Sequence, residues 1–486
     1  MNILVIDIGS SSVRALLFDS ELRLIPDAHA AIAYQLDTTQ LGQATLDPLS
    51  LRSAVERIID TVLQHPQARN IGAVAMATLV GNLMGVDIRG LPTTPIFSYA
   101  DTRCIDSLPQ LRVQVDPQIA HQRTGCPIHT AYHPAKLAWI REIQPEIWKK
   151  TIQWIDFASY LYWSWFNVTT CSYSVASWSG LLNRHSLTWD EPWLQTLGLS
   201  AHQLPVLNDY DARLISLTKQ YAERWSVLKN IPFFLAVGDG AAANVGSGCI
   251  DSNKVALTLG TTGAIRTAFH GHPPALSPAI WNYRIDKTIQ LIGGATSEGG
   301  NIAAWLRQLF NIDDVTIEYI LQSSEPDSHG LTVLPMLIGE RSPGWHADAL
   351  GFIDGLRLST SSAHIVQAFL EAVALRLAVI FEQLQPYIAH DAIVIGGGGA
   401  IIGSPAWTQI IADALDRPIH VADELEVTAR GAAMLVLKSI RSIKLSDYSP
   451  TIKTIIQPRA DVVTRLTAAR KRQSALYTRH YSQLDL

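Results

Sequence analysis

Asp239 is a lone charge in an otherwise small and apolar stretch. The segment FFLAVGDGAAANVGSG, residues 233–248, holds no other charged residue. Its first residues predict a buried strand, and the small residues after Asp239 predict a helix. A carboxylate at a helix N-terminus is stabilised by the helix dipole and is expected to stay ionised. Asp239 is therefore either an N-terminal cap or a base at the floor of a cleft, where Ala241 to Ala243 and Gly246 would leave room for a ligand.

Two glycine-hydroxyl turns have the composition of phosphate-binding sites. DIGSSS (7–12) and LGTTG (259–263) each join glycine to serines or threonines. Glycine lets backbone N–H groups come close to a phosphate, and the hydroxyls add donors. Neither turn matches the GxxxxGK[ST] loop. Asp7 leads the first turn and would hold Mg²⁺ directly or through water, because that ion prefers carboxylate oxygen. The alternative is that Asp7 only caps the serine turn.

The two turns lie in segments that resemble each other. VIDIGSSSVRALLF (5–18) aligns without gaps on ALTLGTTGAIRTAF (256–269), and both predict a strand, a turn and a second strand. The alternative is two unrelated β-hairpins. Duplication is favoured by the shared glycine and paired hydroxyls, and it predicts two similar domains with a cleft between them.

The remaining pattern predicts the elements around these turns. Residues 90–210 are irregular and rich in Trp and Tyr, which is typical of an insertion with a binding surface. GGGGA (396–400) follows a strand and would form either a nucleotide-binding turn or a simple strand-to-helix turn, with Ser404 capping the next helix. The hydrophobic spacing predicts buried strands at 2–9, 71–78, 231–240 and 393–395 and helices at 48–64, 362–385 and 429–440.

Composition limits the function classes. The 486 residues are enough for two or three domains, and 48% apolar with 17% charged residues indicates large buried cores. The net charge of -5 argues against nucleic acid or an anionic membrane as the main partner. No apolar run near 20 residues and no signal peptide are evident, so we expect a cytoplasmic protein without a membrane partner. The four scattered cysteines are expected to be buried free thiols rather than a disulfide or metal site.

The segments together resemble the FGGY carbohydrate kinases of the actin-like ATPase superfamily, over nearly the whole chain. Besides the turns, the resemblance rests on SYADTR (98–103), AKLAWI (135–140), GGATSEGGNIAAWL (293–306), LPMLIGERSPGW (334–345) and GGGGAIIGSPAWTQIIADAL (396–415). It implies an α/β protein with two actin-like, ribonuclease-H-like domains that close over MgATP and a small sugar or polyol. The implied divisions are an N-terminal substrate-side domain (1–235), a C-terminal nucleotide-side domain (236–445) and a helical tail (446–486), with a homodimer allowed but not required.

The resemblance also implies roles for individual residues. Asp239 would be the catalytic base, which also touches the substrate, and Asp7 the carboxylate associated with Mg²⁺. The implied phosphate and ATP residues are Ser10, Ser11, Ser12, Arg14, Gly260, Thr261, Thr262, Gly299, Gly300, Gly398, Gly399, Ala400 and Gly403. The implied substrate residues are Tyr99, Asp101 and Arg103, together with the loop residues Val80, Gly81 and Asn82.

The sequence leaves the substrate open. GDGAAANVGSG and GTTGAIRT are similar to the gluconokinase branch, and either Arg266 or Arg341 could meet a substrate carboxylate, unless both are structural ion-pair residues. Many family members carry Met-His or Trp-His where this chain has Val80-Gly81, so one hydroxyl partner is missing or is replaced by Asn82. We therefore expect ATP-dependent phosphorylation of gluconate, with a xylulokinase- or ribulokinase-like pentulose or polyol kinase as the alternative.

Two other classes compete with an enzyme. A non-catalytic sugar and nucleotide sensor would not need Asp239 and Asp7, and an ADP-release assay over a sugar panel separates it from a kinase. An actin-like structural ATPase would form filaments with ATP, and the sugar-kinase segments argue against it.

Overall fold

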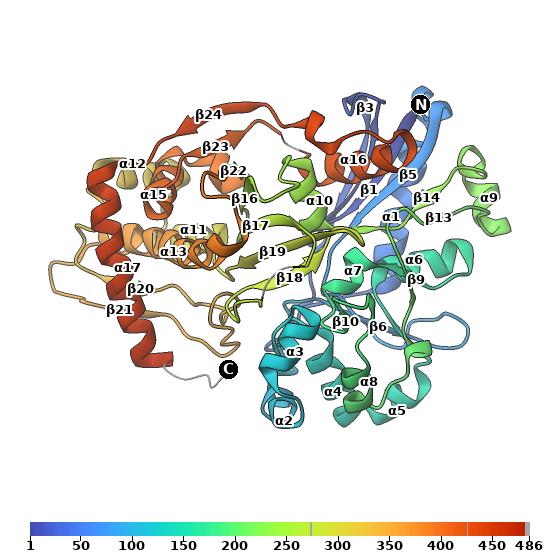
Figure 1. Cartoon of the computed structure of the whole chain (residues 1–486), viewed down its shortest axis with the longest axis horizontal. Helices are drawn as coiled ribbons and strands as arrows, with labels where there is room; N and C mark the ends of the chain where they lie inside the picture. The colour runs from blue at the N-terminus through green and yellow to red at the C-terminus, as the bar shows by residue number, and fades with distance from the viewer. Residues whose placement is uncertain (273–274, 425, 482–486) are drawn as a thin grey trace.

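Two seven-stranded sheets form the framework of the molecule (Figure 1). The computed structural model describes residues 1–272, 275–424 and 426–481. The first sheet contains β1 (Asn2–Ile8), β2 (Ser12–Phe18), β3 (Leu24–Ala33), β5 (Ile71–Thr78), β13 (Arg213–Leu214), β14 (Phe233–Phe234) and β15 (Val237–Gly238). The second contains β16 (Lys254–Leu259), β17 (Gly263–His270), β18 (Trp281–Arg284), β19 (Ile289–Ala295), β22 (Ile393–Gly397), β23 (Ile419–Ala422) and β24 (Ile452–Ile456).

Both sheets are built on the same pattern of strand pairing. β1, β2 and β3 pair antiparallel, and β5 joins the other side of β1 in parallel. In the second sheet β16, β17 and β19 pair antiparallel, and β22 joins β16 in parallel. The hairpin turns differ by one residue, since Gly9 N–H donates to Ser12 O at 2.9 Å, whereas Gly260 N–H donates to Thr262 O at 3.1 Å. The structure thus repeats the arrangement that the internal sequence repeat predicts.

Helices α10 (Asp239–Gly246) and α16 (Val427–Arg441) cross between the sheets. Their backbones touch at Gly246 and Gly431. A methyl group at Gly246 would overlap the carbonyl oxygen of Val427, and one at Gly431 would overlap that of Ala242. A hydrophobic cluster around this crossing includes side chains from both sheets, among them Val5 of β1 and Leu291 of β19. The crossing therefore ties the two halves together.

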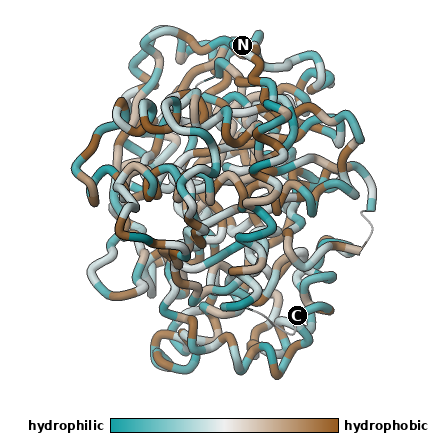
Figure 2. The backbone as a smooth tube through the Cα atoms, turned by 90° about the vertical axis from the view of Figure 1, so that its left-hand side faces the viewer, coloured by the Kyte–Doolittle hydropathy of each residue, from teal (hydrophilic) through white to brown (hydrophobic). Residues whose placement is uncertain are grey.

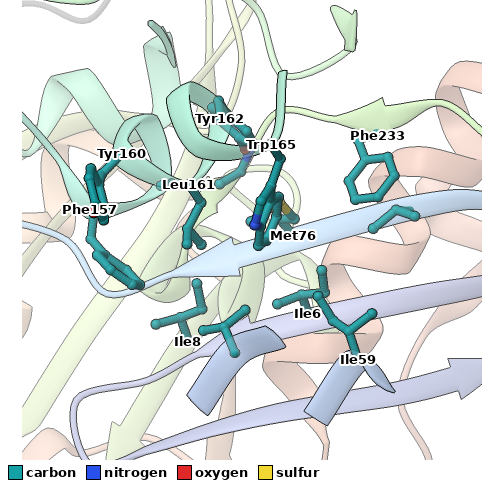
Figure 3. Close-up of a cluster of buried hydrophobic side chains, with 14 of the residues drawn as sticks. Ile6, Ile8, Ile59, Met76, Phe157, Tyr160, Leu161, Tyr162, Trp165 and Phe233 are labelled. Carbon is teal, nitrogen blue, oxygen red and sulfur yellow. The ribbon is translucent and has the colours of Figure 1, made fainter. Parts of the chain in front are cut away.

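The core of the first sheet explains why its predicted strands are almost continuously apolar. Helices α1 (Pro48–Val62) and α6 (Phe157–Phe166) pack on one face of the sheet, and α16 covers the other face, so both faces of β1 and β5 are buried. Figure 3 shows Ile6 and Ile8 of β1 and Met76 of β5 between Ile59 and the aromatic side chains of α6. A sheet covered on both faces loses the alternation of polar and apolar residues.

Residues 90–210 are more ordered than the irregular segment that the sequence predicts. Short helices fold around a hydrophobic core of their own, which includes Leu137, Trp154 and Trp193. The elements of this region are β7 (Ile96–Phe97), α2 (Leu108–Gln114), α3 (Pro117–Thr124), α4 (His133–Ile143), α5 (Pro145–Lys150), β8 (Gln153–Ile155), α6, β9 (Thr170–Ser172), α7 (Tyr173–Ser177), β10 (Leu182–Asn183), β11 (Thr188–Trp189), α8 (Glu191–Leu197) and β12 (Val206–Asn208).

The second sheet is covered by α11 (Gly300–Phe310), α12 (Asp314–Ser323), α13 (Ser362–Leu384), α14 (Gly399–Gly403) and α15 (Pro405–Leu415). Ser404 caps α15 as predicted, accepting from Trp407 N–H at 3.3 Å. The predicted glycine turn is shorter than expected, because Gly396 and Gly397 complete β22. By length and composition, the segment at α13 could cross a membrane, contrary to the expectation from the sequence; most of it is buried here in the core of the second sheet.

The C-terminal tail is not only helical. Its residues 452–456 form β24, which pairs with β23 at the edge of the second sheet. Helix α17 (Ala460–Tyr481) then runs beside β20 (Thr332–Leu334) and β21 (Phe352–Asp354) (Figure 1). Its basic residues lie on the outer face, while Val462, Leu466 and Leu476 are buried. The limits proposed above for the domains and the tail stay a prediction.

The surface elements are amphipathic. Figure 2 shows hydrophobic and hydrophilic residues alternating along the outer helices and loops, as expected where one face of an element packs inward. The N-terminus lies at the top in both views, and α17 ends in the lower half of Figure 1. All four cysteines are buried and free, as predicted.

The helix crossing yields a stability prediction. Gly431→Ala inserts a methyl group where the backbone of α10 lies, so the two helices must move apart. We expect a loss of about 1–3 kcal/mol or more in the free energy of unfolding, measured by denaturant titration. Gly403→Ala is the matched control, because no atom lies within 4 Å of its added methyl group. Equal stability of the two variants would contradict the close packing.

Candidate active site

A cavity of about 280 Å³ opens between the two sheets, in front of the N-terminus of α10. Its polar lining comes from both halves of the chain and comprises Ser10, Asp239, Thr258, Thr262, Arg266, Arg341 and Thr428. Its aromatic lining comprises Tyr99, Tyr132, Trp178, Trp281, Tyr283 and Trp345. Of the residues predicted from the sequence, Ser10, Val80, Gly81, Tyr99, Asp239 and Thr262 line this cavity.

Asp239 is the first residue of α10, and Gly238 occupies the cap position. The carboxylate accepts the N–H of Gly240 at 2.7 Å. Loss of hydration raises the pKa of Asp239 to about 6, against the lowering effect of that hydrogen bond, and the nearby Asp7 raises it further. The expectation that the helix dipole keeps Asp239 an ordinary carboxylate was wrong in degree. Loss of hydration raises its pKa by more than the helix terminus lowers it. Asp239 is still mostly ionised at neutral pH and can accept a proton.

The small residues after Asp239 divide into two groups. Gly240 and Ala243 line the cavity, which agrees with the predicted room for a ligand. Ala241 and Ala242, however, are buried in the cluster that joins the sheets, and Gly246 touches α16. Half of the small-residue pattern therefore serves the helix crossing and not the ligand.

Asp7 is the last but one residue of β1 and is 1% exposed. Burial raises the pKa of Asp7 to about 6, although Arg14 lowers it. One carboxylate oxygen, Oδ2, accepts from Arg14, while Oδ1 is buried without a hydrogen-bond partner. A buried carboxylate oxygen without a partner fits a divalent cation or its bound water. Arg14 also pairs with Glu426 at 2.8 Å and does not line the cavity.

The predicted nucleotide-side residues come together at the ends of β16, β19 and β22. The N–H of Gly300 donates to Gly260 O at 2.7 Å, and the N–H of Asn301 donates to Thr261 O at 3.1 Å. Gly398, with a φ of 94°, lies against the backbone of Leu259 just before the second turn. These contacts place the Gly299–Gly300 loop and the glycines after β22 around one hairpin.

Helix α14 offers an open glycine face beside that hairpin. Gly399 and Gly403 are four residues apart, on one side of the helix. No atom lies within 4 Å of a Cβ built on either residue. A planar group could therefore approach the helix backbone there, and Ala400 adds only a methyl group.

The loop after β5 does not present Asn82 to the cavity. Its amide nitrogen donates to Leu79 O and its amide oxygen accepts from Phe157 N–H, both at 2.8 Å. The side chain is 1% exposed and holds the loop on the start of α6. The hypothesis that Asn82 replaces the missing histidine is not supported, since its amide is occupied. Val80 and Gly81 themselves line the cavity.

Asp101 and Arg103 support the cavity wall from behind. Arg103 pairs with Asp101 at 2.6 Å and lies over the rings of Phe97 and Trp139. Buried Lys136 ties this turn to the neighbouring segment by donating to Asp101 O at 3.2 Å. Tyr99 alone of the predicted segment reaches the cavity, so the other two predicted substrate residues act here as its scaffold.

Arg266 and Arg341 bring positive charge into the cavity. Arg266 is 7% exposed and donates to Thr258 Oγ1 at 2.8 Å. Arg341 donates to Thr296 O and lies 5.3 Å from the ring centre of Tyr99. Neither guanidinium forms an ion pair with a carboxylate among residues 1–272, 275–424 and 426–481. The interpretation of Arg266 and Arg341 as structural ion-pair residues is therefore wrong for the described residues.

The aromatic wall is the part of the site that sequence reasoning missed. Trp178 stacks on Tyr283 with ring centres 3.7 Å apart, and Tyr283 stacks on Trp281 at 4.2 Å. Tyr132 and Tyr283 join their hydroxyls at 2.7 Å. The abundance of Trp and Tyr in residues 90–210 was a signal, but it did not say which rings meet across two domains.

Glu298 is an unusual carboxyl group beside the nucleotide-side glycines. It is 3% exposed, and Oε1 has no hydrogen-bond partner. Burial raises the pKa of Glu298 to about 8, although Arg376 lowers it. Glu298 is therefore mostly neutral at pH 7.

Comparison with known proteins identifies the family. Models of the N-terminal and C-terminal domains of the FGGY family of carbohydrate kinases match residues 2–246 and 255–439. The chain belongs to the FGGY family of carbohydrate kinases. Its two-domain α/β fold is thus the actin-like fold that the sequence predicted, and the protein is a phosphotransferase of the carbohydrate kinase class. Kinases of this family use ATP as the phosphoryl donor.

Individual relatives agree with this assignment. The chain is 28% identical to a gluconokinase of Bacillus subtilis over 455 residues, which cover 91% of this chain and 88% of the relative. A crystal structure of a gluconate kinase from Lactobacillus acidophilus matches with a TM-score of 0.91 at 23% identity, covering 99% of this chain and 98% of that one. A ligand-bound xylulose kinase from the same organism matches with a TM-score of 0.92 at 23% identity, covering 99% of both chains.

Glu298 makes stability depend on pH. Its folded pKa of about 8 exceeds the ordinary value of 4.5, so between these values the folded state holds an extra proton. Stability therefore falls as the pH rises through this window. Glu298→Gln cannot lose a proton, and its melting temperature should exceed that of the wild type by more at about pH 8 than at about pH 5. An equal difference at both pH values would contradict the raised pKa.

Proposed function

We propose that this carbohydrate kinase phosphorylates a primary hydroxyl of an open-chain sugar acid, with gluconate as the first candidate. The observation that carries the proposal is the pair of guanidinium groups, Arg266 and Arg341, that share the cavity with Asp239 and lack carboxylate partners. Partly desolvated cations recognise a carboxylate by charge-assisted hydrogen bonds. A neutral polyol would offer no carboxylate to either guanidinium. The similarity to a gluconokinase supports the same substrate class.

Asp239 acts as the base in the proposed reaction. The substrate oxygen forms a bond to the γ-phosphorus of ATP while the bond from that phosphorus to the bridging oxygen of ADP breaks. The hydroxyl proton passes to the Asp239 carboxylate, which later releases it to water. Phosphoryl transfer depends mainly on alignment and charge neutralisation, so a base with a pKa of about 6 is sufficient.

The phosphate chain is assigned to the two hairpin turns. Ser10, Ser11 and Ser12 would donate from the first turn and Gly260, Thr261 and Thr262 from the second. Mg²⁺, when bound, neutralises phosphate charge, and Asp7 Oδ1 is the oxygen that would hold it or its water. Arg14 fixes the other oxygen of Asp7 and so orients the carboxylate.

The nucleotide is assigned to the glycines of the second domain. Gly299 and Gly300 would approach its phosphates, and Gly398, Gly399, Ala400 and Gly403 would face the rest of the nucleotide. The open face of α14 supports this assignment. Closure of the aromatic wall over the substrate would exclude water and limit hydrolysis of ATP. We place the enzyme in the cytoplasm, where ATP is available; a homodimer stays a prediction.

A substrate assay tests the proposal directly. ADP release is measured with gluconate, xylulose, ribulose and glycerol for the wild type and for Arg341→Met. We expect gluconate to be preferred, and its KM to rise about tenfold or more in the variant, because a charged hydrogen bond is lost. Arg417→Met is the control, because Arg417 is half-buried and does not line this cavity. Preference for a neutral sugar with an unchanged KM in Arg341→Met would refute the sugar-acid assignment.

Asp239 gives a second test. Asp239→Asn should keep the fold and ATP binding while kcat falls by about 10²–10⁴, because the amide cannot accept the proton. In the wild type, kcat/KM should decline about tenfold per pH unit below about pH 6, where Asp239 becomes protonated. Turnover of the Asn variant near that of the wild type would rule out Asp239 as the base. A sensor protein would release no ADP with any sugar of the panel.

A further inference from the structure

The loop of residues 340–346 carries two parts of the cavity wall, Arg341 and Trp345. The loop folds on itself, since Glu340 N–H donates to His346 O and Trp345 N–H to Arg341 O, both at 2.7 Å. Ser342 N–H binds it to the end of β19 through Ala295 O at 3.1 Å. One side of the loop is thus fixed to the second sheet.

The other side of the loop is held through a buried carboxylate. Glu340 is 2% exposed and forms an ion pair with Arg376 of α13. Its second oxygen accepts the hydroxyl of Tyr477, from the C-terminal helix α17, at 2.7 Å. The guanidinium of Arg376 also lies 4.7 Å from the ring centre of Tyr477. The three side chains form one compact group beneath the loop.

Tyr477 touches the loop backbone as well. A Cβ at Gly344 would overlap the Tyr477 hydroxyl, so the backbone lies directly against that oxygen. Helix α17 cannot easily slide, because Gln473 donates to Val333 O at 2.9 Å and to Ala372 O at 3.2 Å. Leu476 packs in a small cluster with Leu334 and Met336, next to the loop. The hydroxyl of Tyr477 is therefore held at a fixed place.

We propose that Tyr477 is a positioning residue that sets Arg341 for the substrate. The proposal rests on the proposed function, in which Arg341 meets the substrate carboxylate. Without the hydroxyl, one oxygen of a dehydrated carboxylate loses its donor, and Glu340 must turn toward another. Because Glu340 and Arg341 are neighbours in a tight loop, that turn moves the Arg341 side chain. Trp345 is tied separately, through its Nε1–H to Pro278 O at 3.1 Å.

The test compares two matched variants of one helix. Tyr477→Phe removes only the hydroxyl bound to Glu340 and keeps the ring beside Arg376. Tyr481→Phe makes the same change one turn later, where the hydroxyl binds the backbone of Leu350, outside the loop. We expect the KM for the sugar acid to rise about tenfold in Tyr477→Phe and to stay within about twofold in Tyr481→Phe. In both variants kcat, the KM for ATP and the melting temperature should stay close to the wild type.

A double variant shows whether Tyr477 acts through Arg341. In the Arg341→Met background, Tyr477→Phe should add no further rise in KM, because coupled residues are not additive. A KM for Tyr477→Phe equal to that of the wild type, or an equal loss in kcat and in neutral-sugar turnover, would overturn the inference. If Arg341→Met alone raises the KM and Tyr477→Phe does not, only this inference fails. If Arg341→Met has no effect on the KM, both this inference and the carboxylate contact of the proposed function fail.

Discussion

The backbone contact between Gly246 and Gly431 is the constraint on which the site depends. It lets α10 and α16 cross with their backbones in contact, and the crossing joins the two sheets through one hydrophobic cluster. Asp239 begins α10, and Thr428 lies in the first turn of α16, so the cavity floor is the end of this crossing. The same packing that holds the domains together therefore fixes the position of Asp239.

Dehydration of the cavity floor has two opposite effects. It raises the pKa of both Asp7 and Asp239, and the nearby charge of Asp7 raises the pKa of Asp239 further. It also strengthens every remaining electrostatic interaction, because water no longer screens it. Arg14 offsets the first effect at Asp7, and the charge of Arg266 lowers the pKa of Asp239. The Asp239 carboxylate is therefore ionised at neutral pH, and its pKa of about 6 lies close to that pH.

The C-terminal helix reaches the loop of the cavity wall. Helix α17 packs against α13, α15 and β20, and Tyr477 meets the loop that carries Arg341. Basic residues on its outer face pair with Glu325 and Asp327. Tyr477 lies instead on the side of the helix that faces the loop. An amphipathic helix has one solvated face and one packed face.

The roles proposed for Asp7 and Asp239 rest on the resemblance to the FGGY kinases. The sequence by itself determined the strands of the repeated hairpins and their glycine-hydroxyl turns. Those features depend on local pattern, since burial periodicity and turn chemistry are written in adjacent residues. Only the tertiary structure decided that Asn82 faces away from the cavity, that Arg266 and Arg341 lack carboxylate partners, and that the aromatic wall spans both domains. Each of these facts depends on contacts between side chains that are far apart in the sequence. Neither secondary-structure propensity nor residue spacing predicts such contacts.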